Sequence, residues 1–334
     1  MKKGVLVAFF LMVIGVFAFA NGQPEQKVLH MYTAFDTAEA QYYIEAYEKQ
    51  TGVDVQWVRL SAGEVLARVS AEAANPQASV WFGGSNTSHI DAVSKGLLAP
   101  YKPNIDFTLA DSFHDSNWMW TGIYNGAIGF VSNKNFLQKN NIPAPTSWQD
   151  LLNPVFKNNV VIAYPYTSGT SYTTYATLIQ LYGLDKTLAF WKQFDQQSVF
   201  QYTKSGTGGI PMAGLGQCAV AIGFSHDIVA KGIDQGYPVV MSFPKEGTGY
   251  EVGAVALIKG GKEPALAKQF IDWSLSVPAQ NLYQKYERLP LNPNATVSKG
   301  AIRMTEINLI NYDAQAMGLN QDKYIQAWRD AIGK

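Results

Sequence analysis

The chain alternates short apolar runs with longer amphipathic stretches from residue 27 onward. Lys27–Tyr32 and Val53–Val58 have the length and composition of strands, and Thr37–Gln50 between them repeats its apolar residues at helical spacing. This order of strand, helix and strand predicts an α/β sheet with parallel strand pairs. The same pattern predicts further strands at Ser79–Phe82, Thr121–Ser132, Val160–Ala163, Cys218–Gly223, Val239–Phe243 and Glu251–Ile258, and further helices at Gly63–Glu72, Asn86–Ser94, Ser147–Leu152, Ser171–Tyr182, Asp227–Gln235, Pro264–Tyr286 and Gln321–Ala331.

The N-terminal segment has a different pattern. Lys2 and Lys3 precede an apolar run, Val5–Phe19, and a small residue at Ala20 leads into a polar stretch. This three-part order predicts a secretory signal peptide over residues 1–20, cleaved after Ala20. The alternative, a membrane anchor, needs about 20 apolar residues, which is more than this run has. We therefore expect an exported, periplasmic protein.

Length and charge narrow the class of protein. A chain of 334 residues is too long for one hydrophobic core, so we expect two lobes. The 26 Lys and Arg balance the 26 Asp and Glu, and no basic run follows the signal peptide. Binding to nucleic acid needs Lys and Arg gathered on one face, so we exclude a nucleic-acid partner.

The number and position of cysteines bear on whether the exported protein is cross-linked or carries a lipid anchor. Cys218 is the only cysteine, so an intramolecular disulfide is impossible, and no cysteine follows the predicted cleavage point to carry a lipid. Its apolar neighbours predict a buried, unreactive thiol. We expect a soluble monomer that needs no metal and no cofactor.

Three loops place hydroxyl or glycine residues after a predicted strand and at the start of a predicted helix. They are residues 33–37, 83–86 and 167–171, and a fourth polar turn follows at 203–209. Helix N-termini offer free backbone N–H groups and a positive dipole end, and ligands of α/β sheets bind at the carboxyl ends of strands. Together the loops predict a cleft that binds an anion through N–H groups and hydroxyls rather than clustered Arg and Lys. Taken singly, each polar residue has the alternative role of capping its own helix.

A second set of polar residues follows the predicted strand that ends at Gly223. His226 and Asp227 are adjacent in a turn between strand and helix, so both side chains could face a cleft and contact sugar hydroxyls. Glu251 begins an otherwise apolar strand and is a third candidate. The alternative is that Asp227 caps a helix and that His226 and Glu251 are solvated.

Motifs of enzymes are absent from the sequence. We find no Gly-x-Ser-x-Gly turn, no His-Glu-x-x-His helix and no nucleotide-type phosphate loop. His114 lies between Asp111 and Asp115 in a polar loop, but no further metal ligand accompanies them. We therefore predict a protein that is not an enzyme.

Several stretches together resemble one protein family. They are residues 47–53, 95–101, 143–152 and 253–260, with the sequences YEKQTGV, KGLLAPY, PAPTSWQDLL and GAVALIKG. The chain is similar in them to the type II periplasmic binding proteins of ABC importers, in the branch of ferric-ion, hexose-phosphate and aminoethylphosphonate carriers. The resemblance implies two α/β lobes with mixed sheets, joined by two crossing strands and closing on a ligand, and a membrane permease as partner. Lobe 1 would comprise 27–120 plus 250–287, and lobe 2 would comprise 121–249 plus 288–334.

The resemblance also suggests a ligand. Ferric carriers of this branch have two consecutive Tyr after the strand that here ends at Gly223, whereas this chain has Ser225, His226 and Asp227. Without phenolate donors the site is poor for Fe(III) and looks like the hexose-phosphate branch. By this resemblance the sugar hydroxyls would meet His226, Asp227 and Glu251, and the phosphate would meet Ser168, Gly169, Thr170 and Ser205, together with Thr33, Phe35, Ser85 and Thr207.

We therefore predict a binding protein for a small phosphorylated solute, with a hexose phosphate as the first candidate. Three alternatives stay open. The first is a carrier of ferric or another metal ion, and the second is a phosphonate carrier. The third is a secreted hydrolase of phosphate esters that would use His226 and Asp227.

Overall fold

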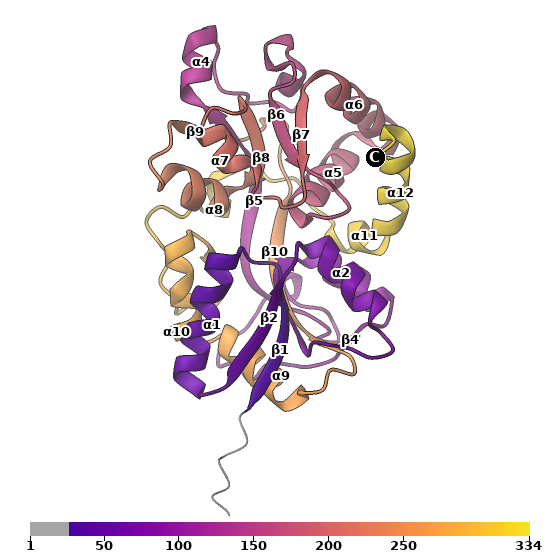
Figure 1. The fold of residues 1–334 in the computed structure, drawn as a ribbon, viewed down its shortest axis with the longest axis vertical. Coiled ribbons are helices and arrows are strands. Elements are labelled where there is room, and N and C mark those ends of the chain that lie inside the picture. Colours follow the sequence, from indigo (N-terminus) through magenta and orange to yellow (C-terminus); the bar gives the residue numbers. More distant parts are fainter. Residues whose placement is uncertain (1–26) are drawn as a thin grey trace, which may run out of the picture.

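The computed structural model describes residues 27–334, so the predicted signal peptide lies outside the described residues. Two lobes stand one above the other, joined by the long strands β5 (Thr121–Asn133) and β10 (Tyr250–Ile258) (Figure 1). The first half of β5 pairs with β10 in lobe 1, and its second half, from Ile128, pairs in lobe 2. The predicted two-lobe α/β fold with crossing strands is confirmed.

Lobe 1 is built on a mixed sheet with the strand order β2-β1-β3-β10-β5. The strands β1, β2 and β3 run parallel, and β10 runs antiparallel to β3. The elements of this lobe are β1 (Val28–Thr33), β2 (Asp54–Arg59), β3 (Val80–Ser85), β4 (Leu98–Ala99), α1 (Thr37–Thr51), α2 (Ala62–Ala71), α3 (Asn86–Ser94), α9 (Pro264–Ser274) and α10 (Val277–Asn281).

Lobe 2 repeats the plan with the order β5-β8-β6-β7, in which β6 runs parallel to β7 and β8. A further strand, β9, pairs with β5. The elements are β6 (Val160–Ala163), β7 (Val199–Thr203), β8 (Val220–Phe224), β9 (Val239–Ser242), α4 (Lys134–Asn140), α5 (Gly169–Tyr182), α6 (Leu184–Gln197), α7 (Gly209–Gly214), α8 (Ser225–Ile228), a π-helical turn (Val229–Ile233) and α12 (Gln321–Ile332). One more helix, α11 (Ala314–Leu319), contacts both lobes.

Each lobe has its own hydrophobic core, rich in aromatic rings. In lobe 1, Phe82 packs edge-on against Phe270 of α9. In lobe 2, Trp191 of α6 packs edge-on against Trp328 of α12. Cys218 is buried as predicted, and burial raises the pKa of its thiol to about 12. The cores hold the sheets rigid, so the loops at the strand ends have defined positions.

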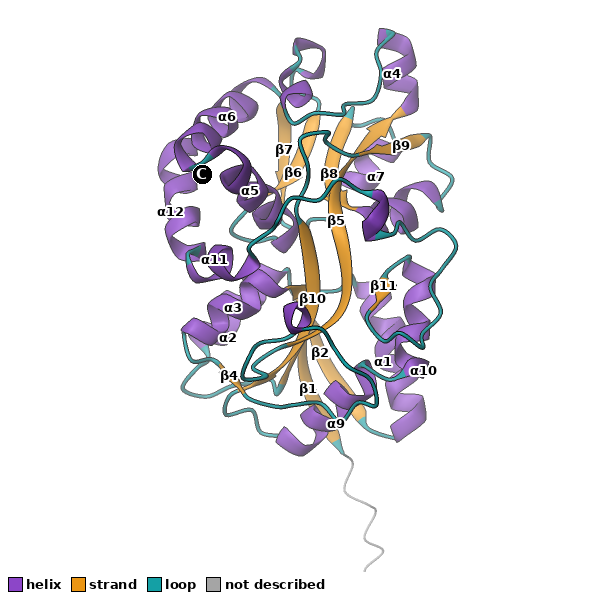
Figure 2. Cartoon of the chain, turned by 180° about the vertical axis from the view of Figure 1, so that it is seen from behind, coloured by secondary structure: helices purple, strands orange, loops and turns teal. Residues whose placement is uncertain are grey.

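The chain after residue 287 is shared between the lobes, unlike the predicted division that gave 288–334 to lobe 2. The short strand β11 (Leu289–Pro290) pairs with the lobe 1 half of β5, and the Asn292 side chain donates to the Leu275 carbonyl. Beyond it, α11 lies against α3 of lobe 1, and α12 packs on α6 of lobe 2 (Figure 2). A buried ion pair between Arg288 and Glu39 also holds the start of this segment on lobe 1.

Among residues 27–334, no helix combines the length and the apolar character needed to cross a membrane.

Candidate functional site

A pocket lies between the lobes, at the carboxyl ends of strands from both sheets. Its position agrees with the general rule for ligands of open α/β sheets. Eight of the eleven residues predicted from the sequence line it, namely Ser85, Ser168, Gly169, Thr170, Ser205, Thr207, Asp227 and Glu251.

The other three predicted residues do not line the pocket. Thr33 is buried, and its hydroxyl accepts a hydrogen bond from the Phe35 N–H at 3.3 Å. Phe35 packs in the core of lobe 1 against the Phe82 ring. His226 is 2% exposed and lies behind Asp227, against Arg288. These three residues therefore pack behind the side chains that line the pocket.

Hydroxyl groups and helix starts gather at one end of the pocket. Ser85 immediately precedes α3 but makes no capping bond, and its hydroxyl lies 3.2 Å from that of Thr87. Ser168 precedes α5 and accepts a hydrogen bond from the Ser171 N–H at 3.4 Å. The capping role therefore applies to Ser168 and not to the Ser85 side chain. Two helix N-termini with hydroxyls beside them suit an anion.

The turn between β7 and α7 closes over this end of the pocket. Ser205 and Thr207 have their hydroxyls 3.0 Å apart, and Gly206 lies between them. A Cβ atom on Gly206 would lie 2.0 Å from Thr170 Oγ1 and 2.7 Å from Ser168 Oγ. Only glycine lets this turn approach the start of α5 so closely.

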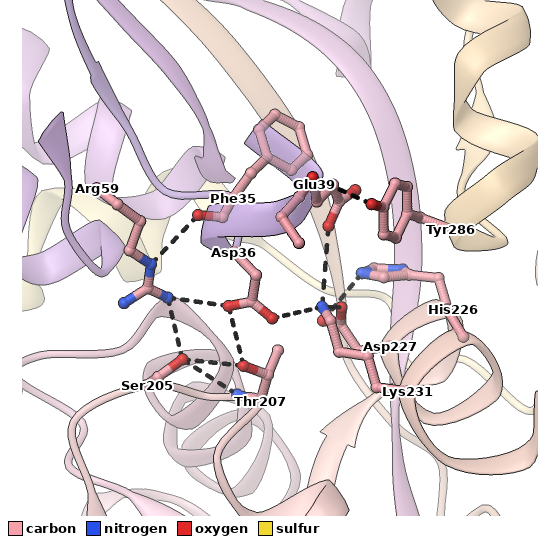
Figure 3. Close-up of polar contacts among 12 residues, drawn as sticks. Phe35, Asp36, Glu39, Arg59, Ser205, Thr207, His226, Asp227, Lys231 and Tyr286 are labelled. Carbon is pink, nitrogen blue, oxygen red and sulfur yellow. Dashed lines mark hydrogen bonds and ion pairs between the residues drawn. The ribbon is translucent and has the colours of Figure 1, made fainter. Parts of the chain in front are cut away.

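Asp36 connects the two lobes across the pocket. Its carboxylate pairs with Lys231 Nζ of lobe 2 at 2.7 Å and accepts a hydrogen bond from the Thr207 hydroxyl at 3.1 Å (Figure 3). Arg59 of lobe 1 pairs with Asp36 at 3.2 Å and donates to the Ser205 hydroxyl at 3.0 Å. Opening of the lobes would break the contacts with Lys231, Thr207 and Ser205.

A buried cluster of charges forms the other end of the pocket. Arg288 forms a two-point ion pair with Glu39, and its guanidinium also lies 3.5 Å from Asp227 Oδ1. Lys231 lies one helical turn after Asp227 and forms an ion pair with it. Each of the two cations thus contacts buried carboxylates, which offsets the cost of removing these charges from water.

The protonation states at this end follow from burial and charge. Burial, with the nearby Arg288 acting in the same direction, lowers the pKa of His226 to about 4. Burial alone would raise the pKa of Asp227, but the adjacent cations Lys231 and Arg288 outweigh it and hold that pKa well below the usual range. Burial raises the pKa of Glu251 to about 8, against the opposing effect of Arg288. At pH 7 the pocket therefore holds an ionised Asp227, a protonated Glu251 and a neutral histidine behind them.

Three cationic side chains that were not predicted from the sequence also line the pocket. They are Arg59, Lys231 and Arg288. The expectation of an anion site without clustered Arg and Lys is thus wrong. Two of them had a sequence signal. Arg59 is the last residue of β2, and residues at strand ends were the basis for predicting the pocket loops. Lys231 lies four residues after the predicted Asp227, which is the spacing of an ion pair within one helix. For Arg288 no local signal existed, because its partners are 62 and 249 residues away.

Within residues 27–334, no group of three or more His, Cys, Asp or Glu side chains is arranged to hold a metal ion.

Comparisons with known proteins place the chain in a family. Residues 82–315 match the family model described as bacterial extracellular solute-binding protein. An uncharacterized protein of Haemophilus influenzae is 34% identical over 293 residues, which cover 85% of this chain and 84% of that protein. A Salmonella typhimurium protein, provisionally named as a 2-aminoethylphosphonate-binding periplasmic protein, is 30% identical over 161 residues, or 46% of this chain and 45% of that one.

Solved structures show the same fold. The periplasmic binding protein AfuA from Actinobacillus pleuropneumoniae, with fructose-6-phosphate bound, is 33% identical with a TM-score of 0.88, over 92% of this chain and 99% of that one. The periplasmic binding protein P5PA is 30% identical with a TM-score of 0.86, over 92% and 100%. Iron-bound HitA from Pseudomonas aeruginosa is 18% identical with a TM-score of 0.79, over 91% and 99%, and shows the fold alone. The chain therefore belongs to the bacterial extracellular solute-binding proteins, in the group of periplasmic binding proteins of ABC transporters.

Proposed function

We propose that this protein captures a small phosphorylated solute, a sugar phosphate of the fructose 6-phosphate type, and delivers it to the membrane permease of an ABC importer. The observation that carries the proposal is a single pocket with two chemically different ends. One end has hydroxyls and helix starts, and the other has buried carboxyl groups with Lys231 and Arg288 beside them.

The hydroxyl end suits a phosphate group. Free N–H groups at the starts of α3 and α5 and the hydroxyls of Ser85 and Thr170 offer donors to phosphate oxygens. Arg59 lies beside Ser205 and adds a positive charge at the same wall. A dianion is thus met by donors from both lobes, so its binding favours the closed arrangement.

The carboxyl end suits sugar hydroxyls. The ionised Asp227 accepts hydrogen bonds, and the protonated Glu251 donates one, so the pair matches neighbouring hydroxyls that donate and accept. AfuA, which is 33% identical, has fructose-6-phosphate bound, and this likeness supports the same ligand class here.

An aminophosphonate fits this end less well. Its ammonium group would seek Asp227, but Lys231 already pairs with that carboxylate, and Arg288 lies 3.5 Å from it. Because its charge is already shared between these two cations, the Asp227 carboxylate attracts an ammonium group less strongly than an unpaired carboxylate would. The charges of the pocket thus favour a neutral polyol end over an ammonium end.

A ferric carrier is also disfavoured. The positions after β8 hold Ser225, His226 and Asp227 rather than paired tyrosines. Arg288 and Lys231 next to Asp227 would also repel a trivalent cation.

A ligand panel measured by thermal shift and calorimetry tests the proposal. We expect stabilisation by fructose 6-phosphate and glucose 6-phosphate, a smaller effect of inorganic phosphate, and none of fructose. Stabilisation by 2-aminoethylphosphonate above that of every sugar phosphate would replace the proposal with a phosphonate carrier. A coloured complex with ferric citrate would replace it with an iron carrier.

Gly206→Ala should weaken binding of fructose 6-phosphate and of inorganic phosphate alike, by roughly tenfold or more. The added methyl group would collide with Thr170 Oγ1 and Ser168 Oγ and push the turn off the phosphate end. Gly208→Ala in the same turn is the matched control, because its Cβ would meet no atom closer than 3.2 Å. Calorimetry with both ligands measures the effect, and equal losses in both variants would contradict the proposed geometry.

Asp36→Ala should raise the dissociation rate of fructose 6-phosphate by roughly tenfold, because one ion pair and one hydrogen bond across the lobes are lost. Lys231 keeps Asp227 as partner, so the fold should hold. Asp185→Ala, at an exposed carboxylate in the first turn of α6, is the control. Stopped-flow displacement measures the rate, and an unchanged rate would show that these contacts do not hold the lobes together.

A further inference from the structure

Arg288 occupies a buried position at the junction of the pocket and the core of lobe 1. It immediately precedes β11, and only 4% of its surface is exposed. Its guanidinium lies between two aromatic rings, 4.9 Å from the Phe35 centroid and 4.3 Å from the Tyr124 centroid. Two ring faces in contact with a desolvated guanidinium fix its plane. Phe35, which does not reach the pocket, thus helps to position a residue that does.

Glu39 also holds the Arg288 guanidinium, in addition to the two aromatic rings. Its two carboxylate oxygens accept hydrogen bonds from Nε and Nη2 of Arg288, the latter at 2.9 Å. Glu39 also accepts a hydrogen bond from the Tyr43 hydroxyl at 2.7 Å, so both partners of the ion pair are held by the core. A two-point contact of this kind defines orientation as well as distance. Nη1 is then left to point at the side chain of His226.

The contact between Arg288 Nη1 and His226 Nε2 constrains the histidine. A guanidinium only donates hydrogen bonds and stays charged in proteins. His226 Nε2 must therefore present a lone pair, and the ring proton must lie on Nδ1. Nδ1 faces the backbone of Gly126, where a Cβ atom would lie 2.2 Å away, and among the described residues it has no hydrogen-bond partner.

We propose that Arg288, held by Glu39, is a positioning residue that keeps His226 neutral with its proton on Nδ1, and so directs the Asp227 carboxylate to the ligand. His226 Nε2 lies 3.4 Å from Asp227 Oδ2 and 3.6 Å from Glu251 Oε1. Without a proton on Nε2, the histidine cannot donate to either group. Oδ2 of Asp227 thus remains an acceptor for a hydroxyl of the solute, a consequence that rests on the proposed function.

The charges around the ring agree with a neutral histidine. Burial lowers the pKa of His226 to about 4, and Arg288 acts in the same direction, against Asp227 and Glu39. Glu251 also faces the ring, and the Tyr124 and Phe224 rings cover its other sides. The ring is thus expected to stay neutral throughout the range from pH 5.5 to pH 8.

Nitrogen-15 NMR of the histidine rings in the ligand-free protein tests the proton position directly. The chain has four histidines, so the His226→Gln variant identifies the signals of His226 by their loss. We expect a neutral ring with the proton on Nδ1 and no titration between pH 5.5 and pH 8. A proton on Nε2, or a ring that titrates within this range, would overturn the proposal. Because no ligand is present, this result does not depend on whether sugar phosphates bind.

Arg288→Met and Arg288→Lys test the effect on the ligand. In Arg288→Met we expect the proton to move to Nε2, affinity for fructose 6-phosphate to fall at least about tenfold, and affinity for inorganic phosphate to change less than about threefold. Arg288→Lys keeps a donor for Nε2 and should restore the Nδ1 proton. A purely structural role would lower both affinities together with the ring signals unchanged, which would overturn the proposal. The wild-type spectrum decides the proton position even if Arg288→Met does not fold.

Discussion

Asp227→Ala should reduce affinity for fructose 6-phosphate roughly thirtyfold and affinity for inorganic phosphate less than about threefold. Asp227 is the ionised acceptor at the sugar end, and hydrogen bonds to a charged group contribute about 1.5–3 kcal/mol each. The phosphate end is formed by hydroxyls and helix starts that do not contact this side chain. Affinity should therefore fall for the ligand that carries a sugar and change little for inorganic phosphate.

Calorimetry with both ligands measures this ratio. Asp234→Ala is the matched control, because this carboxylate directly follows the π-helical turn and is exposed. Thermal unfolding of the variant must also be recorded, since Lys231 and Arg288 lose a buried partner. Equal losses for sugar phosphate and phosphate would contradict the division of the pocket into two ends.

Glu251→Gln should stabilise the ligand-free protein at pH 7 by up to about 3 kcal/mol and should have little effect near pH 4. Burial raises the pKa of Glu251 from its ordinary 4.5 to about 8. Between these values the unfolded chain releases the proton and the folded chain keeps it. The folded state therefore binds more protons, and its stability falls as the pH rises from 4.5 towards 8. A glutamine has the shape of the neutral acid and does not ionise, so it removes this loss.

Denaturant unfolding of wild type and Glu251→Gln at pH 4, 6 and 8 measures the difference. It should grow with pH and level off above about pH 8, where the folded carboxyl group also ionises. Glu306→Gln, at an exposed carboxylate, should show no such trend. A difference that is constant with pH would mean that Glu251 is ionised in the folded protein, despite its burial beside Asp227.

Local pattern was sufficient for most elements of the fold. The predicted helix at Asn86–Ser94 and strand at Val160–Ala163 have the same bounds in the structure. The predicted tail helix is divided at Leu275, where the chain turns into α10. The helix α6 and the strand β7 were not predicted. In α6 the apolar side chains of Leu184, Leu188, Trp191 and Phe194 recur at helical spacing, so a sequence signal was present and was missed.

The hydroxyl end of the pocket was accessible from sequence for a physical reason. In a sheet with parallel strands, every loop that follows a strand reaches the same edge, so order along the chain translates into proximity in space. Ser85, Ser168 and Thr170 follow this rule, and all three line the pocket.

Sequence by itself therefore determined the α/β architecture and the strand-end loops, because both follow from local periodicity and the order of elements. The two lobes were expected from the chain length and from the family resemblance. Only the tertiary structure decided the charge pattern of the pocket. Arg288 reaches Glu39 across 249 residues, and Lys231 meets Asp36 only where the lobes touch. The protonation of Glu251 and His226 depends on burial by these distant neighbours, and desolvation is a property of the folded surroundings rather than of any local pattern.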